Sequence, residues 1–130
     1  MKHFTSKNQK TGELGEEICT QWLNKNGFTI IERNFTQKEG EIDIITLKDD
    51  IYHFIEVKSV SCVTTDDINH ETIYNPLQNV TREKIQKCFK VINNYKNQKR
   101  LKNEVQFDVY AIYIDKRNIK HKIERIENVF

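Results

Sequence analysis

Residues 40–58 carry the strongest structural pattern in the chain, and they read Gly40-Glu41-Ile42-Asp43-Ile44-Ile45-Thr46-Leu47-Lys48-Asp49-Asp50-Ile51-Tyr52-His53-Phe54-Ile55-Glu56-Val57-Lys58. Two runs of β-branched and aromatic residues, 42–47 and 51–57, flank Lys48-Asp49-Asp50, whose residue types favour a turn. This pattern predicts a β-hairpin with a two-residue loop.

The register of such a hairpin brings four charged residues together. Counting back from the loop places Asp43 opposite Glu56 and Glu41 opposite Lys58. Because side chains alternate along a strand, all four lie on one face of the hairpin. The other face is then a seam for the core, formed by Ile42, Ile44, Ile55 and Val57.

Opposed carboxylates at the edge of a core need an explanation, because they repel each other and lose hydration. A divalent cation supplies one. Asp43 and Glu56 offer the oxygen ligands that Mg²⁺ prefers, and Lys58 is positioned to hold a water molecule or to stabilise a phosphate. The alternative is a solvent-exposed hairpin whose acidic residues and lysines pair across the strands.

These residues resemble a known signature. Asp43, followed after one strand and a turn by Glu56-Val57-Lys58, resembles the PD-(D/E)xK motif of nucleases. Residues 40–45 and 54–58 are similar in sequence to the bacterial YraN family of small predicted endonucleases, which are related in fold to archaeal Holliday-junction resolvases. The similarity covers nearly the whole chain, because it extends to Gly12-Glu13-Leu14-Gly15-Glu16, Arg33-Asn34, Phe107-Asp108-Val109-Tyr110-Ala111-Ile112 and Ile126-Glu127-Asn128-Val129-Phe130.

The resemblance implies a single α/β domain over residues 1–130, with a restriction-endonuclease-like fold in which helices flank a mixed β-sheet. It implies Mg²⁺- or Mn²⁺-dependent hydrolysis of DNA, with branched or Holliday-junction DNA as candidate substrates. Asp43, Glu56 and Glu16 would be the metal ligands, and Lys58 would complete the catalytic set. Spacing alone instead places Glu16 on the solvated side of a helix, near its positive end.

Two positions depart from the family pattern. Val60 and Thr36 stand where related sequences usually carry basic residues, and both positions are ones at which phosphate contacts are expected. The alternative function is therefore a DNA-binding or complex-forming module that keeps the nuclease fold without cutting. If the protein does cut, paired cuts in two strands would favour a homodimer.

The composition fits one domain that meets nucleic acid. The chain has 130 residues and a formal net charge of +2, and no Pro-, Gly- or Ser-rich linker divides it. Residues 1–80 are acidic on balance and residues 81–130 are basic. An acidic metal-binding half joined to a basic half suits a phosphate-rich polymer, although an ordinary globular protein can show the same distribution.

The cysteines and the hydropathy indicate the cytoplasm. Cys19, Cys62 and Cys88 are odd in number and widely spaced, which favours reduced thiols over a disulfide framework or a zinc site. The first eight residues lack the apolar core of a signal peptide, and no later segment approaches a membrane span. We therefore expect a soluble cytoplasmic protein with no membrane partner.

Two helices are expected. Thr11 caps the first, which ends at Gly27, and Gly15 lets it approach the sheet closely. Its apolar stripe is Leu14, Ile18, Trp22 and Leu23. The second helix runs from Pro76 to Asn97. Its buried stripe is Leu77, Val80, Ile85, Phe89, Ile92 and Tyr95.

The exposed face of the second helix is the expected DNA surface, and it carries Arg82, Lys84, Lys87, Lys90 and Lys96. Lys84 is nearest to the basic position of the YraN family, and Arg33 joins the DNA-binding set through the same resemblance. Because no aromatic side chains interleave with these lysines, contacts to the phosphate backbone are favoured over base stacking.

The remaining strands complete the order α-β-β-β-α-β-β. We expect strands at 28–34, 105–114 and 119–126, with a turn at 115–118 between the last two. Residues 59–75 lack periodicity and are expected to form a loop beside the site, in which His70 is exposed. Asp108 either supports the site from a neighbouring strand or is a structural partner for a nearby base.

Overall fold

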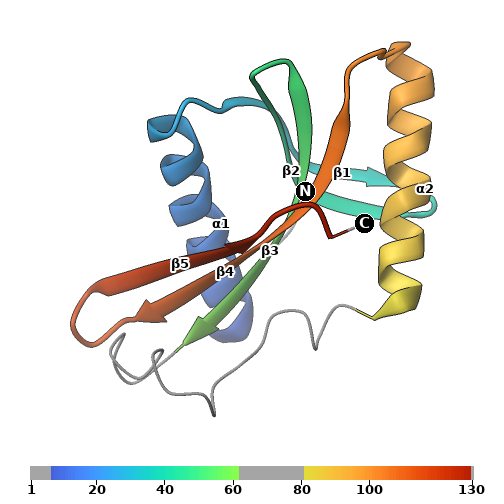
Figure 1. Ribbon diagram of the computed structural model, residues 1–130. Coiled ribbons are helices and arrows are strands. Elements are labelled where there is room, and N and C mark those ends of the chain that lie inside the picture. Colours follow the sequence, from blue (N-terminus) through green and yellow to red (C-terminus); the bar gives the residue numbers. More distant parts are fainter. Residues whose placement is uncertain (1–6, 62–80, 130) are drawn as a thin grey trace.

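The computed structural model describes residues 7–61 and 81–129. Within them, two helices flank one five-stranded sheet (Figure 1). The elements are α1 (Lys7–Lys25), β1 (Thr29–Gln37), β2 (Gly40–Lys48), β3 (Ile51–Ser61), α2 (Arg82–Lys99), β4 (Val105–Asp115) and β5 (Lys120–Ile126). The strands follow the order β1-β2-β3-β4-β5; β3 and β4 are parallel, and the other neighbours are antiparallel. The predicted α/β class, mixed sheet and element order are confirmed.

The loop of the central hairpin has the predicted form. Asp49 and Asp50 both adopt left-handed backbone conformations, with φ of 51° and 67°, as a two-residue hairpin turn requires. Lys48 pairs with Ile51, and the ladder continues from there to the pair Ile44 and Ile55. The predicted register is therefore confirmed over these five pairs.

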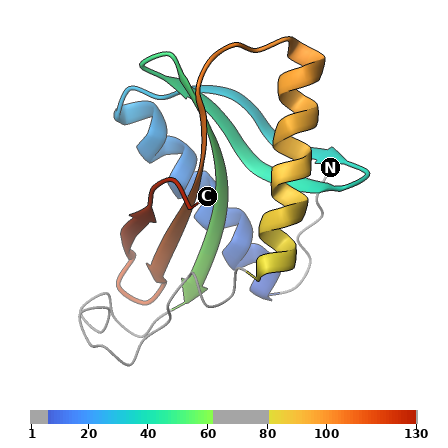
Figure 2. The same cartoon turned by 45° about the vertical axis from the view of Figure 1, so that its right-hand side comes forward.

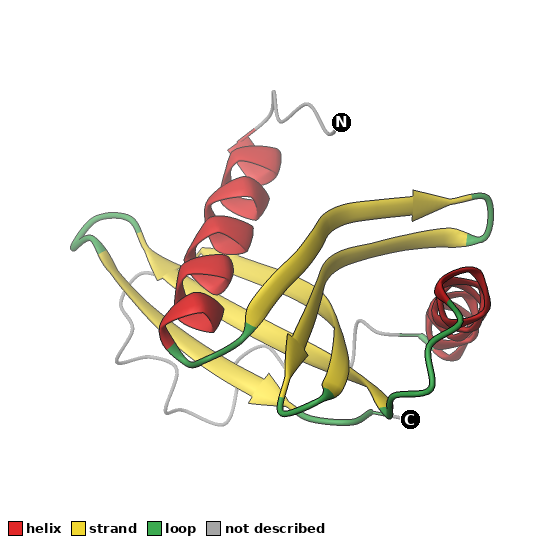
Figure 3. Ribbon diagram, turned by 90° about the horizontal axis from the view of Figure 1, so that it is seen from above, coloured by secondary structure: helices red, strands yellow, loops and turns green. Residues whose placement is uncertain are grey.

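Beyond Ile44 and Ile55 the two strands separate. The N-terminal end of β2, which begins at Gly40, stays paired with β1, whereas β3 continues alongside β4 as far as Ser61. In the view from above, the β1–β2 hairpin leaves the rest of the sheet and its turn lies beside α2 (Figure 3). Asp43 and Glu56 follow the last pair directly, so they stand at the fork of the sheet.

The helices cover opposite faces of the sheet. Cys19 and Leu23 of α1 pack on one face against Ile44, Ile55 and other buried residues. The cluster on the α2 face contains Ile42, Ile45, Phe54, Cys88, Val91, Ile92, Tyr95 and Phe107. The prediction that Ile42 shares a face with Ile44 is therefore wrong. Strict alternation is lost where β2 turns away from β3, and Ile42 joins Ile45 on the α2 side.

Helix α1 starts earlier than predicted, and the face that it buries differs from the predicted apolar stripe. It begins at Lys7, so Thr11 lies inside the helix and the predicted cap is wrong. Gly27, with φ of 85°, ends it as expected. A Cβ atom on Gly15 would lie 1.7 Å from Ser59 Oγ, which confirms that this glycine permits close approach to β3. Leu14 is 41% exposed, so the buried face of α1 differs from the predicted stripe.

Helix α2 is described from Arg82, and Thr81 caps it by accepting a hydrogen bond from the Lys84 backbone N–H. This cap shows that the helix does not start at the predicted Pro76, which, like the loop residue His70, lies outside the described residues. The buried seam is Cys88, Val91, Ile92 and Tyr95. Phe89, which was expected in this seam, is 49% exposed, because the helix turns its Cys88 side to the hairpin. Neither described helix is long and apolar enough to cross a bilayer.

Candidate active site

Asp43 joins the two arms of the forked sheet. Its side chain is buried, and Oδ2 accepts a hydrogen bond of 2.8 Å from the backbone N–H of Val57 on β3. The carboxylate thus bonds to β3 at the point where the β2 backbone has stopped pairing with it. This contact holds Asp43 against the peptide unit that follows Glu56.

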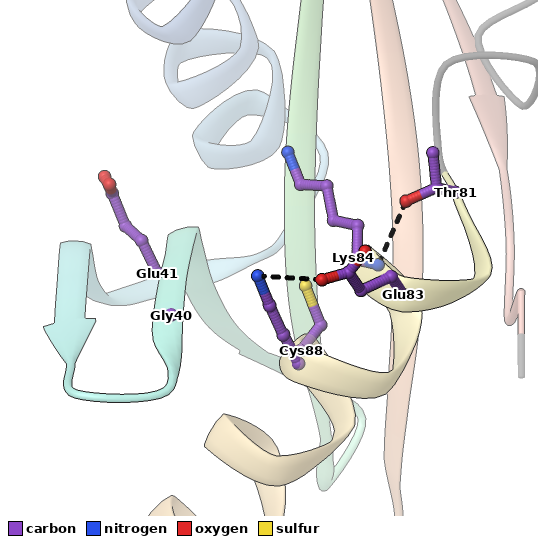
Figure 4. A pocket seen from close by; sticks show the side chains of 7 residues that line it. Gly40, Glu41, Thr81, Glu83, Lys84 and Cys88 are labelled. Carbon is purple, nitrogen blue, oxygen red and sulfur yellow. Dashed lines mark hydrogen bonds and ion pairs between the residues drawn. The ribbon is translucent and has the colours of Figure 1, made fainter.

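Glu56 is the most crowded charged residue of the site. It is 5% exposed, and its Oε1 contacts the ammonium groups of both Lys84 from α2 and Lys58 from β3, the second at 3.3 Å. Figure 4 shows the Lys84 side chain extending from α2 toward β3. Burial and the negative charge of Asp43 raise the pKa of the Glu56 carboxyl, although both lysines oppose the rise.

The two lysines differ in how they reach Glu56. Lys58 lies two residues further along the same strand and face, as predicted, and its side chain is 23% exposed. Lys84 comes from a different element, and its side chain is 38% exposed. Burial alone would lower the pKa of Lys84, but the attraction of Glu56 more than offsets burial, so the pKa is raised and the group stays charged.

Glu16 is buried in α1, at 7% exposure, so its predicted placement on a solvated face is wrong. Gly15, which directly precedes it, lies against Ser59 of β3, so this part of α1 faces the sheet. Burial raises the pKa of the Cys19 thiol, and the charges of Asp43 and Glu16 raise it further. Both carboxylates therefore act on one thiol from two different elements.

The donor set of the fork fits a hard divalent cation. Among the described residues, no three His, Cys, Asp or Glu side chains are gathered closely enough to enclose a metal. Mg²⁺, however, usually keeps several waters and uses one or two carboxylates together with substrate phosphate oxygens. Asp43 and Glu56 provide such a pair, and both are buried.

The residues expected to bind DNA are divided by the structure. Lys84 points to Glu56 and is not part of a purely solvated face. Lys87 pairs with Glu83 at 3.4 Å across one helical turn, Arg33 contacts Glu17 at 3.2 Å, and Arg82 is exposed. Of the expected face of α2, Arg82, Lys87 and Lys90 therefore remain exposed.

A hollow of about 340 Å³ lies between the β1–β2 hairpin and the first turns of α2 (Figure 4). Sequence reasoning missed it, although Gly40 signals it, since the missing side chain leaves room on the hairpin. Lys84 and Cys88 link the hollow to the charges of the fork: the pKa of the buried Cys88 thiol is raised to about 11, by burial and by the charge of Glu56. Its lining is Gly40, Glu41, Thr81, Glu83, Lys84, Lys87 and Cys88.

Asp108 does not join this site. It is fully buried and contacts His53 Nδ1 at 2.9 Å, and it accepts hydrogen bonds from the Gln106 side chain and the Asn128 backbone. In the parallel register Asp108 lies beside Ile55, whose side chain packs on the α1 face. Of the two predicted roles, the structural partner of a nearby base is the one observed. His53 was not singled out from the sequence.

Comparison with known proteins finds close relatives. The model of the uncharacterised protein family UPF0102 matches residues 15–112. A UPF0102 protein of Campylobacter hominis is 42% identical over 123 residues, which cover 95% of this chain and 96% of the relative. A UPF0102 protein of Clostridium kluyveri is 39% identical over 125 residues, or 95% of each chain. The similarity therefore spans both arms of the sheet and both helices.

Proposed function

The chain belongs to the uncharacterised protein family UPF0102, and we propose that it is a metal-dependent endonuclease that hydrolyses phosphodiester bonds of DNA. The observation that carries the proposal is the buried pair Asp43 and Glu56 at the fork of the sheet. A carboxyl whose pKa is raised by burial and by a second carboxylate is typical of functional sites. The resemblance to PD-(D/E)xK nucleases supports the same assignment.

Asp43 and Glu56 would hold Mg²⁺ or Mn²⁺, and Glu16 on α1, which is not gathered with them into one cluster, would act on the bound ion through its charge. When bound, such an ion polarises a phosphoryl oxygen and lowers the pKa of a bound water. Asp43 is fixed for this role by its bond to Val57 N–H, which holds the carboxylate against the peptide unit that follows Glu56. The buried position of both acids keeps bulk water away from the charges.

Lys58 would act on the substrate. Its ammonium lies 3.3 Å from Glu56 Oε1, so it shares the volume proposed for the metal. Two cations side by side are unfavourable unless an anion lies between them. A scissile phosphate with its attacking water is such an anion, and Lys58 would orient that water or offset the charge that develops on the phosphate.

DNA is the proposed polymer because the basic part of the chain borders the site. Arg82 and Lys87 stand at the start of α2 beside the hollow, and residues 81–130 are basic on balance. Contacts of this kind neutralise phosphates without reading bases. They support binding through the backbone and through the shape of the DNA.

A cleavage screen tests the proposal. Wild-type protein is incubated with linear, flapped and four-way DNA in Mg²⁺, in Mn²⁺ and in EDTA, beside the Asp43→Asn/Glu56→Gln variant. We expect cleavage of at least one substrate with metal, and none in EDTA or with the variant. DNA binding without any cleavage would instead assign a non-cleaving module with a nuclease fold.

A further inference from the structure

Lys84 occupies the space in which a metal ligated by Glu56 would sit. Its ammonium contacts Glu56 Oε1, the same oxygen atom that Lys58 approaches to 3.3 Å. A divalent cation on that oxygen would lie within a few ångströms of both ammonium groups. At such distances like charges repel strongly in a buried site. One of the two lysines must therefore leave before a metal can bind.

The structure distinguishes the lysine that can leave. Lys58 is held on β3, where its backbone pairs with Ala111 of β4, and its side chain is the more enclosed of the two. Lys84 reaches the site from α2 and is one of the residues that line the 340 Å³ hollow. Rotation about its side-chain bonds carries the Lys84 ammonium from Glu56 into the hollow, with no change in the backbone.

We infer that Lys84 is a built-in counter-ion that fills the metal position of the free protein and is released into the hollow when metal binds, where it contacts a DNA phosphate. This inference rests on the proposed function. It explains why a lysine on the expected DNA surface points inward. The inference also assigns a ligand to the hollow. This ligand is the DNA phosphate next to the scissile one, which would bind between Lys84 and Lys87.

Metal binding and DNA binding are then coupled through one side chain. Metal frees the ammonium for DNA, and by linkage DNA that captures the ammonium clears Glu56 for metal. Without metal, Lys84 is tied to Glu56 and contributes little to DNA affinity. Glu41 and Glu83 also line the hollow, and their negative charges would repel a phosphate. The released Lys84 ammonium is therefore needed to offset this repulsion.

Calorimetric titration with Mn²⁺ at pH 8 tests the counter-ion. Lys84→Met removes the competing ammonium and should tighten Mn²⁺ binding about tenfold or more. Lys84→Arg keeps the charge and should stay near wild type. Lys99→Met is the matched control: it removes one charge from the same helix, but from an exposed position in its last turn. It should leave the Mn²⁺ affinity within about twofold.

A second measurement tests the release. Binding of a short DNA duplex is compared in EDTA and in Ca²⁺, which is used as a non-reactive ion. Wild type should bind DNA several-fold more tightly with Ca²⁺, and Lys84→Met should lose most of that gain. Thermal unfolding in EDTA checks that each variant is folded.

The outcomes separate this inference from the proposed function. Wild-type protein that binds no Mn²⁺ overturns both. Wild-type protein that binds Mn²⁺ while Lys84→Met binds it equally or more weakly overturns only the counter-ion, and shows Lys84 to be a structural link between α2 and β3. Tighter metal binding by Lys84→Met with an unchanged Ca²⁺ effect on DNA overturns the release into the hollow.

Discussion

One oxygen atom, Glu56 Oε1, receives two ammonium groups, and the roles proposed for them are opposite. Lys84 yields its place to the metal, whereas Lys58 stays beside it. The difference follows from where each residue is anchored, since one is on the strand that carries Glu56 and the other is on a helix across a hollow. Two lysine variants should therefore behave differently in the same assays.

Lys58→Ala should lower metal-dependent DNA cleavage by roughly a hundredfold or more, the scale expected when one preorganised charge or proton-transfer group is lost. Mn²⁺ affinity should be unchanged or slightly higher, because a cation has been removed from the site, and DNA affinity should be nearly unchanged. Single-turnover cleavage and calorimetry measure these quantities. Lys120→Ala, at an exposed position of β5, is the control. Cleavage by Lys58→Ala at the wild-type rate would contradict the mechanism.

The raised pKa of Glu56 predicts how stability changes with pH. A carboxyl whose pKa is higher in the folded protein stabilises the fold below its ordinary pKa, and this contribution is lost as the pH rises through the raised value. In EDTA, the Glu56→Gln variant should therefore show a flatter fall in the free energy of unfolding from the ordinary Glu range upward. Urea unfolding at a series of pH values measures both slopes, and equal slopes would refute the assignment.

At the scale of the elements, the contact between α1 and β3 sets the depth of Glu16. Gly15→Ala would bring a methyl group into Ser59, so α1 must shift outward, and overpacking of this kind costs about 1–3 kcal/mol. We expect the free energy of unfolding to fall by that amount. If Glu16 helps to hold the metal, Mn²⁺ binding should also weaken.

A double-mutant cycle isolates that contact. Ser59→Gly removes the atoms that the new methyl group would meet, so Gly15→Ala should cost clearly less in the Ser59→Gly background. Urea unfolding of the four proteins gives the coupling energy. Additive effects would mean that the close approach does not limit the position of α1.

The central hairpin was predictable because its determinants are local. Lys48-Asp49-Asp50 fixes the loop, and the loop fixes the register from Lys48 to Ile44. The face of Ile42 was not predictable, since it depends on where β2 leaves β3, which is a property of the whole sheet. For the same reason, spacing placed Glu16 in solvent: the face that α1 buries depends on its packing against the sheet, where Gly15 approaches Ser59, 44 positions away in the chain.

The residues Asp43, Glu56 and Lys58 of the candidate site were predicted from the sequence, but the contact that Lys84 makes with Glu56 was not. Asp43, Glu56 and Lys58 lie close together as predicted, although the strands separate just before the predicted pair of Asp43 and Glu56. The inward position of Lys84 could not be read from its helix, because a lysine with a long side chain can point to solvent or into a site from the same helical position. Only the location of α2 relative to β3 decides between the two.

At the scale of the whole molecule, the basic residues beside the site should govern DNA affinity. Reversing Arg82 and Lys87 to Glu should weaken binding to all DNA sequences alike and reduce the slope of log affinity against log salt by about 1–2. Titrations at several salt concentrations measure this slope. The matched control reverses Lys120 and Lys122 on β5, and an equal effect there would move the binding surface away from α2.

The forked sheet has a mechanical consequence. Asp43 belongs to the arm formed by β1 and β2, and Glu56 belongs to the body formed by β3, β4 and β5. A movement of the arm relative to the body therefore changes the distance between the two carboxylates. The far end of the arm lies beside α2 (Figure 2). A Cβ atom on Gly40 would lie 3.6 Å from Val91 Cγ2. A ligand that presses the arm against α2, such as a nucleic acid strand, would therefore set the distance between the two carboxylates from outside the site.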